Sequence, residues 1–166
     1  MTTPPTPSLA ERLVRVWVTY IKGQFVLAII IGGLTWLVSA GLGLRWALAL
    51  GAVAGVFEAV PSIGPIIAVI PAVIVALWQG SSVVPVENWV FALIVLGVYI
   101  LIQQVGALII EPRVLGERLH LPPLLVFLGV LAGAALGGIV GALLAVPLIA
   151  SVREVIDYWQ GRPPIS

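Results

Sequence analysis

The sequence predicts an all-α integral membrane protein built from two inverted units, each with one transmembrane helix and one helical hairpin broken by proline or glycine. Of the 166 residues, 61% are apolar and only 9% are charged, whereas soluble domains carry about 25% charged residues. Three long runs contain no charge, namely 23–41, 59–86 and 88–110. Each reaches or exceeds the roughly 20 residues that cross a bilayer as a helix. In addition, the two halves of the chain resemble one another in sequence.

The N-terminal region, residues 1–22, is expected to be a disordered tail followed by an interfacial helix. Residues 1–7 are rich in proline and threonine. Ser8 and Glu11 form a capping-box pattern, in which each side chain satisfies a free amide at the helix start. The basic and aromatic residues that follow are typical of a membrane interface. A spanning helix is then predicted from 23 to 40.

The next segment, from 46 to 78, is interrupted by Pro61, Ser62, Gly64 and Pro65. Two prolines and a glycine this close together break a helix. The arms before and after the break are each about 20 Å long, shorter than a ~30 Å hydrocarbon core. We therefore expect a re-entrant hairpin that completes the first membrane unit, residues 23–78. The alternative is two short full spans, since both arrangements cross the membrane an even number of times.

The second membrane unit is predicted at 89–150, after an extracytoplasmic loop at 79–88. It begins with a span at 89–110 and continues through a charged cytoplasmic loop at 111–120. The apolar stretch that follows contains Gly137 and Gly138 near its centre, which predicts a second broken hairpin. The alternative is an unbroken helix, because glycines recur there every four residues and would form one packing face. Residues 151–166 are an expected amphipathic tail.

The two halves repeat one another. Residues 50–55 (LGAVAG) resemble 128–133 (LGVLAG), and 64–71 (GPIIAVIP) resemble 141–147 (GALLAVP). One span separates the two hairpins, so the second unit is inverted relative to the first, as in many transporters. With the N-terminus and C-terminus both cytoplasmic, seven of the eight basic residues lie inside and only Arg45 lies outside, which obeys the positive-inside rule. A multi-pass protein of the bacterial inner membrane is expected.

Candidate transport-pathway residues gather at the helix breaks and in the second span. Glu58 is the one acidic residue inside an apolar segment, and such residues often mark an ion or substrate pathway; the alternative is that it reaches the headgroups. Ser62, Gly64 and Pro65 would leave backbone groups free to bind ions, or form a plain turn. Gln103 and Gln104 either line the pathway or bond to a neighbouring helix. The full set of candidates is Glu58, Pro61, Ser62, Gly64, Pro65, Gln103, Gln104, Gly137 and Gly138.

Enzymatic function is not predicted. The chain has one histidine and no cysteine, and it lacks the HExxH, P-loop, GxSxG and CxxC motifs. No cofactor and no metal site is therefore expected, and any transport would be secondary or passive. The expected partners are the lipid bilayer and a small polar solute or ion, with no nucleic acid.

Two segments resemble the AI-2E family of bacterial transporters, which includes the autoinducer-2 exporter. Residues 57–77 (FEAVPSIGPIIAVIPAVIVAL) are similar to its IPyiGP signature, and 111–150 resemble its C-terminal pattern of P-x-x-x-G, L-x-P-L and G-x-x-G-x-x-x-A-V-P-L. The similarity extends from about Tyr20 to Tyr158. It implies export of a small polar signal or another small solute, sodium/proton exchange in some relatives, and a homo-oligomer.

This sequence departs from the family pattern in two ways. Many members carry an acidic residue in the second span where Gly106 stands here, which leaves Glu58 as the stronger ionic candidate. Members are also typically longer, so the chain resembles a C-terminal half. The alternative function is accordingly a truncated or assembly-only membrane subunit that does not transport by itself.

Overall fold

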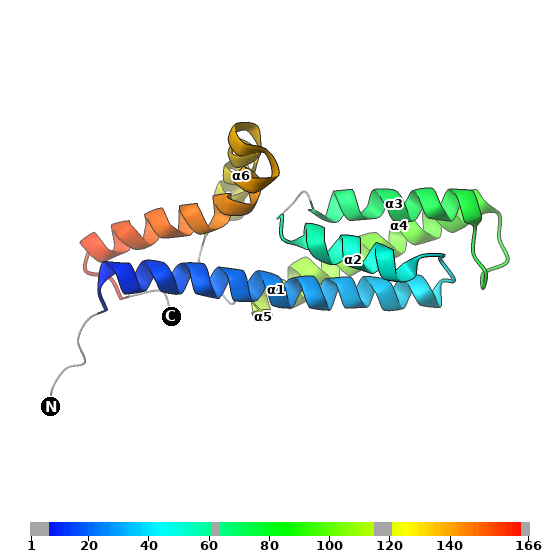
Figure 1. Ribbon diagram of the computed structural model, residues 1–166, viewed down its shortest axis with the longest axis horizontal. Helices are drawn as coiled ribbons and strands as arrows, with labels where there is room; N and C mark the ends of the chain where they lie inside the picture. The colour runs from blue at the N-terminus through cyan, green and yellow to red at the C-terminus, as the bar shows by residue number, and fades with distance from the viewer. Residues whose placement is uncertain (1–6, 61–63, 115–120, 164–166) are drawn as a thin grey trace, which may run out of the picture. The chain divides into compact units, whose positions relative to one another are not determined.

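The computed structural model describes residues 7–60, 64–114 and 121–163. In these ranges the chain forms helices and no strands (Figure 1), which confirms the all-α prediction for the described part of the chain. The helices, in order, are α1 (Leu9–Gly41), α2 (Ala47–Glu58), α3 (Gly64–Gln79), α4 (Asn88–Val105), the π-helical turn η1 (Gly106–Ile110), α5 (Glu111–Val114) and α6 (Pro123–Trp159).

Helix α1 begins at the predicted capping box. The Ser8 amide donates to Glu11 Oε2 at 2.8 Å, and the Glu11 amide donates to Ser8 Oγ at 3.3 Å. The expected interfacial helix and first span are one continuous helix of 33 residues. Within the described residues, three helices are long and apolar enough to cross a membrane: Leu9–Gly41, Asn88–Ile110 and Leu124–Trp159.

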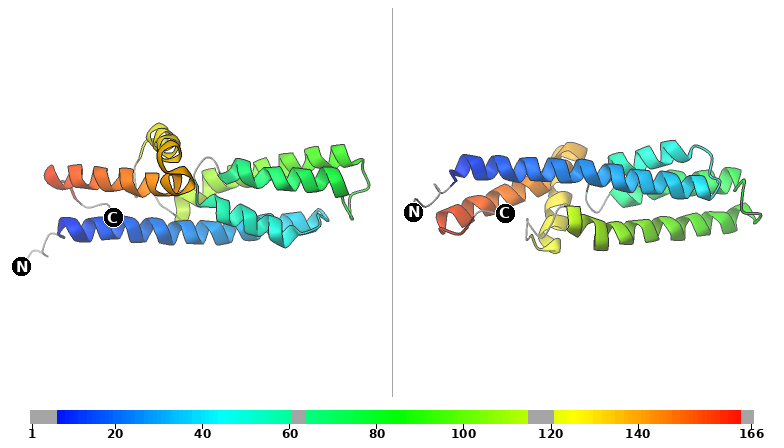
Figure 2. Two further views of the ribbon diagram at one scale, coloured as in Figure 1. Left: turned by 45° about the horizontal axis from the view of Figure 1, so that its top comes forward. Right: turned by 90° about the horizontal axis from the view of Figure 1, so that it is seen from below.

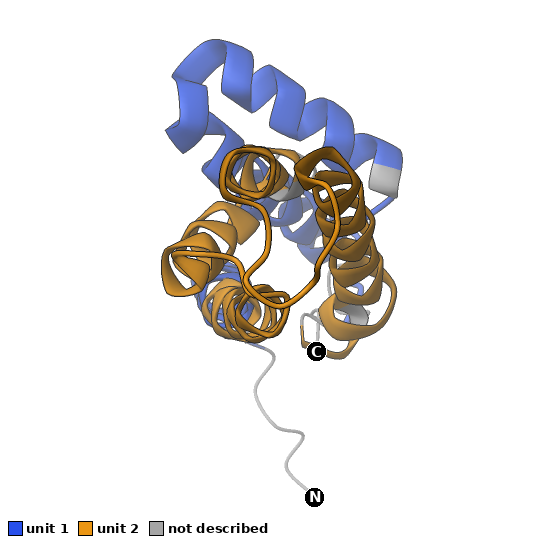
Figure 3. Cartoon of the chain, turned by 90° about the vertical axis from the view of Figure 1, so that its right-hand side faces the viewer, with its two compact units in different colours: residues 1–23, 115–166 blue, residues 24–114 orange. Residues whose placement is uncertain are grey.

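The chain packs as two compact units, shown in different colours in Figure 3. The central unit comprises residues 24–114, and the terminal unit comprises residues 1–23 and 115–166. Helix α1 contributes its first part to the terminal unit and the remainder to the central unit. This grouping describes packing, and the expected division into two inverted membrane units stays a prediction.

In the central unit, α1 and α2 run antiparallel with their backbones in close contact. A Cβ added at Gly32 would lie 2.9 Å from the Gly51 carbonyl oxygen, and one added at Gly55 would lie 2.6 Å from the Ala28 carbonyl oxygen. Residues 28 and 32 therefore face 55 and 51. Small residues spaced by four are the usual way for membrane helices to approach this closely.

Helix α3 packs against both α2 and α4 (Figures 1 and 2). Its small residues Ala72 and Ala76 are buried in a cluster with Leu50 of α2 and with Phe91 and Val95 of α4. Tyr99 belongs to the same cluster, and its hydroxyl forms a buried hydrogen bond of 2.8 Å with the hydroxyl of Ser39.

Two loops of the central unit meet at one end of its bundle. The Ser81 hydroxyl, in the loop between α3 and α4, donates to the Leu42 carbonyl at 2.6 Å, in the turn between α1 and α2. Ser81 Oγ also accepts hydrogen bonds from the amides of Val83 and Val84. The end of α2 at Glu58 and the start of α3 at Gly64, which we call the tip of the α2–α3 hairpin, therefore lie at the opposite end of these two helices.

In the terminal unit, α6 changes direction at Gly137 and Gly138. Both have non-helical backbone angles, and Gly138 has φ 60°, a left-handed conformation that favours glycine. A Cβ at Gly133 would lie 3.2 Å from the Cβ of Ala145, although these residues would be about 18 Å apart along a straight helix. The segment therefore doubles back as two arms, as the broken-hairpin interpretation predicts. Whether the hairpin is re-entrant stays a prediction.

Candidate functional site

Glu58 is the last residue of α2 and stands at the tip of the α2–α3 hairpin. Its side chain is buried, with 6% of its surface exposed. Its Oε2 atom has no hydrogen-bond partner among the residues that the structure describes. Buried carboxylates are normally paired or hydrogen-bonded, because removing a charge from water is costly. Glu58 is therefore an incompletely satisfied acid in an apolar bundle.

Glu111 is a second acidic residue whose charge acts on Glu58. It follows the π-helical turn η1 as the first residue of α5, and its negative charge interacts with that of Glu58. Glu111 is half-buried, and this burial raises the pKa of its carboxyl group. A π-helical turn changes the direction in which the following side chains point, so η1 helps to set where Glu111 lies.

The cationic side chains nearby do not neutralise this pair within the described structure. The helices of the central unit contain three charged residues in total: Glu58, Glu111 and Arg113. Arg113 is exposed, and no ion pair joins it to either carboxylate in the described ranges. The two acids thus carry like charges that no ion pair neutralises among the described residues.

A third polar residue, Gln24, is on the side of α1 that faces α2. Ala28 lies opposite Gly55, so Gln24, one turn earlier on the same stripe, lies toward the hairpin tip. Its Oε1 atom is buried and has no partner in the described part of the chain. Glu58 and Gln24 thus each have a buried oxygen without a described partner, as do Thr35 and Gln79 farther from this end of α2.

The helix break itself is described only in part. Pro61 and Ser62 lie outside the described residues. The Gly64 amide donates to the Val60 carbonyl at 2.9 Å, and a Cβ at Gly64 would overlap the Phe57 carbonyl, so only glycine fits there. Pro65 is the second residue of α3, where the first turn of a helix tolerates a missing amide donor.

No described hydrogen bond or ion pair joins Gln103 or Gln104 to Glu58. Gln103 is half-buried and Gln104 is exposed on α4. Gly106 is buried, and a Cβ there would lie 3.0 Å from Ile31 Cδ1, so a larger residue would require Ile31 to shift. Gly137 and Gly138 form the bend of α6 in the terminal unit, and a side chain at either would meet open space.

Sequence reasoning assigned Glu111 to a cytoplasmic loop and did not consider Gln24. Glu111 is 53 positions from Glu58 in the chain, so no local pattern connects them. The available signal was the scarcity of charge: between 24 and 114, few charged residues lie within helices. Each such residue is therefore a candidate for function.

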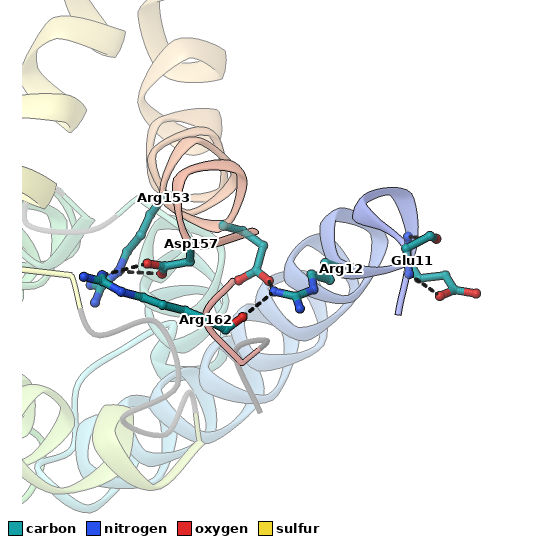
Figure 4. Close-up of polar contacts among 7 residues, drawn as sticks. Glu11, Arg12, Arg153, Asp157 and Arg162 are labelled. Atoms are coloured by element: carbon teal, nitrogen blue, oxygen red, sulfur yellow. Dashed lines mark hydrogen bonds and ion pairs between the residues drawn. The ribbon is translucent and has the colours of Figure 1, made fainter. Parts of the chain in front are cut away.

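The terminal unit holds a separate charged cluster (Figure 4). Arg12 Nη1 lies 3.4 Å from Glu154 Oε1 and donates to the Arg162 carbonyl at 3.0 Å. The Arg12 guanidinium also lies 5.2 Å from the centre of the Tyr158 ring, and Arg162 pairs with Asp157 at 3.0 Å. These ion pairs join the start of α1 to the end of α6, although Arg12 Nε and Glu154 Oε2 have no hydrogen-bond partner among the described residues.

The sequence is similar to a protein-family model and to several named proteins. The model of the AI-2E family transporters matches residues 6–161. YrrI of Bacillus subtilis, named as a transport protein, is 34% identical over 84% of this chain and 37% of its own length. The AI-2 transport protein TqsA of Escherichia coli is 33% identical over 89% of this chain and 41% of its own length. The chain thus spans well under half the length of these relatives.

Proposed function

Because the chain belongs to the AI-2E family of transporters, we propose that it exports a small polar solute or signal across the bacterial inner membrane by secondary or passive transport. The name of TqsA, an AI-2 transport protein, suggests a solute similar to autoinducer-2. We propose further that transport is coupled to an ion at Glu58. The chain covers 37% and 41% of the lengths of YrrI and TqsA. That this chain transports a solute by itself is therefore also a proposal.

The observation that carries the proposal is the buried Glu58 at the tip of a broken hairpin. An ionisable residue among apolar helices is costly, and in membrane proteins it generally faces a pathway or a bundle interior. The central unit provides such an interior, since Glu58 is 6% exposed and retains an unpaired oxygen among the described residues. Backbone at the helix break beside it would supply further polar groups.

The proposed topology has both termini in the cytoplasm, two inverted re-entrant hairpins and a homo-oligomeric assembly. The meeting of the α1–α2 turn with the α3–α4 loop supports an even number of crossings between them. The bend of α6 at Gly137 and Gly138 supports a second hairpin. The many exposed apolar side chains of the long helices, such as Phe25, Leu101 and Leu136, suit contact with lipid or with further copies of the chain.

Reconstitution tests this proposal directly. The purified chain would be placed in lipid vesicles, and uptake or release of radiolabelled small polar solutes, autoinducer-2 included, would be measured. We expect saturable flux, reduced tenfold or more by Glu58→Gln. Glu87→Gln is the matched control, because Glu87 is an exposed glutamate before α4 without a side-chain capping bond.

Two outcomes would count against the proposal. Equal flux in the Glu58→Gln and unmodified proteins would remove Glu58 from the pathway. Absence of selective flux in well-folded, correctly inserted protein would favour an assembly subunit over a self-sufficient transporter.

A further inference from the structure

Three exposed tryptophans gather at one end of the central unit. Trp46, Trp78 and Trp89 are 71%, 82% and 62% exposed. The first directly precedes α2, the second is in the last turn of α3, and the third is in the first turn of α4. The hydrogen bond from Ser81 to the Leu42 carbonyl joins the connections between these helices. The three side chains therefore share one end of the bundle, which we call the loop end.

Trp46 has a backbone conformation that a bulky residue rarely adopts. Its φ and ψ are 61° and 28°, in the left-handed region, where a large side chain is an outlier. Glycine adopts this conformation without strain. Because the side chain of Trp46 is largely exposed, packing within the central unit does not explain why a tryptophan stands here. A contact outside the chain accounts for it.

The loop end also carries the other side chains that are typical of a membrane surface. Arg45 and Glu87 are exposed there, and the exposed apolar residues Val83 and Val86 lie in the same loop as Glu87. Tryptophan concentrates at the headgroup level of a bilayer, because its ring is apolar and its N–H is polar. By contrast, the sequence from 54 to 70 contains no tryptophan, tyrosine, lysine or arginine. The loop end and the tip of the α2–α3 hairpin thus differ in kind.

The lengths of the helices determine how far each one extends from the loop end. Helices α2 and α3 have 12 and 16 residues, or about 18 and 24 Å. The segment Asn88–Ile110 has 23 residues, or about 35 Å. A hydrocarbon core is about 30 Å thick, so Asn88–Ile110 can cross it, whereas α2 and α3 end before its far side. The exposed side chains near their ends, Val56 and Ile66, are apolar, as contact with hydrocarbon requires.

We propose that the loop end is a lipid-binding surface, which docks into the headgroup layer of one leaflet through Trp46, Trp78 and Trp89. Arg45, beside the first of these rings, is placed to meet a lipid phosphate. The tip of the α2–α3 hairpin then ends inside the hydrocarbon core, and Glu58 lies roughly 18 Å from the level of the tryptophans along α2. This inference deepens the re-entrant topology proposed above, because it assigns the hairpin a depth and a leaflet contact.

Spin labels on single cysteines measure this depth in lipid vesicles, since the chain has no native cysteine. For each label, collisions with oxygen, which concentrates in hydrocarbon, are compared with collisions with a water-soluble nickel complex. Three exposed positions follow α3 from the loop end toward the tip: Ile74, Ile70 and Ile66. Three exposed positions follow α4 and η1 as the matched control: Leu93, Leu101 and Leu108.

The two series should differ at their far ends. On the control series we expect the depth to rise to Leu101 and to fall again at Leu108, because that segment crosses the core. On α3 we expect Ile74 to be shallow and Ile66 to be as deep as Leu101, about 10 Å or more below the headgroups. A label replacing each tryptophan in turn, which leaves the other two rings in place, should lie at the boundary and collide with both oxygen and nickel.

Three results would overturn the inference. A label at Ile66 as shallow as one at Leu108 would mean that α2 and α3 span the membrane. Labels at the tryptophan positions that collide with nickel alone would place the loop end in water. Labels there that are shielded from both reagents would assign this surface to a second copy of the chain. Flux without the expected depths would refute this inference alone, whereas the expected depths without flux would refute the proposed transport alone.

Discussion

At the scale of single residues, the structure turns Glu111 from a loop charge into a half-buried acid whose charge acts on Glu58. The sequence singled out Glu58 because one acid in an apolar segment is visible without a fold. The electrostatic effect of Glu111 on Glu58 depends on the fold of residues 24–114, which no local pattern encodes. Gln24 escaped notice for the same reason, since its importance follows from the facing of residues 28 and 55.

The half-buried position of Glu111 predicts a pH dependence of stability. Burial raises the pKa of its carboxyl above the ordinary value of 4.5, so the fold favours the protonated form. Its contribution to stability is present at low pH and is lost as pH rises through the raised pKa. We expect the thermal midpoint of the protein in detergent to fall with rising pH over this range.

Substitution isolates the contribution of Glu111. Glu111→Gln cannot ionise, so its midpoint should fall less over the same pH range, and the gain over the unmodified protein should be largest at the alkaline end. Differential scanning fluorimetry across pH would measure this. If the thermal midpoints of the two proteins differed by the same amount at every pH, Glu111 would not be the source of the pH dependence.

At the scale of helices, two neighbouring glycines of α1 give a matched pair for testing the α1–α2 contact. A Cβ at Gly32 would press on the backbone of Gly51 and Gly55, whereas one at Gly33 would meet nothing within 4 Å. We expect Gly32→Ala to lower the free energy of unfolding by about 1–3 kcal/mol through overpacking. Gly33→Ala should be neutral or should stabilise by up to about 1 kcal/mol, because alanine favours helix.

Unfolding of both variants by titration with denaturing detergent would supply the comparison. Equal effects of the two substitutions would show that α1 and α2 are not in close contact. Because α2 is the first arm of the α2–α3 hairpin, the same experiment also tests whether this arm packs against α1.

The charged cluster of the terminal unit gives a second prediction at this scale. Arg12 and Glu154 are 7% and 1% exposed, and removing one partner leaves an uncompensated buried charge. Arg12→Met should therefore cost roughly 3–5 kcal/mol of stability. Arg15→Met is the control, because Arg15 lies on the exposed side of the same helix. If Arg12→Met lowers the free energy of unfolding no more than Arg15→Met does, the Arg12–Glu154 ion pair contributes no net stability.

Most helix positions could be predicted from the sequence, and the exceptions have physical causes. The predicted arms at 46–60 and 66–78 correspond to Ala47–Glu58 and Gly64–Gln79, because proline and glycine mark the break. Gly23 did not end a helix, since a single glycine lowers helix stability without preventing it, so α1 is continuous. The glycines at 129, 133, 137 and 141 fit two interpretations, and only the backbone angles at Gly137 and Gly138 show the bend.

At the scale of the whole molecule, composition and family similarity determine the class of protein, and the topology rests on the charge distribution. The described residues form helices, three of which are long and apolar enough to span a membrane. The inverted arrangement of the units, the sidedness of the termini and the re-entrant nature of the hairpins all remain predictions. They depend on a bilayer, and a chain with few charges offers few markers of its position in one.

The central claim is that the tip of the α2–α3 hairpin lies in a water-accessible transport pathway. The chain has no native cysteine, so a Glu58→Cys variant in sealed membranes would carry a single reactive thiol. We predict that a small, charged, membrane-impermeant thiol reagent modifies this cysteine although position 58 is buried. A Glu58→Cys protein that stays unreactive, while a cysteine at the exposed Trp46 position reacts, would show that Glu58 is sealed inside the bundle and would contradict the account.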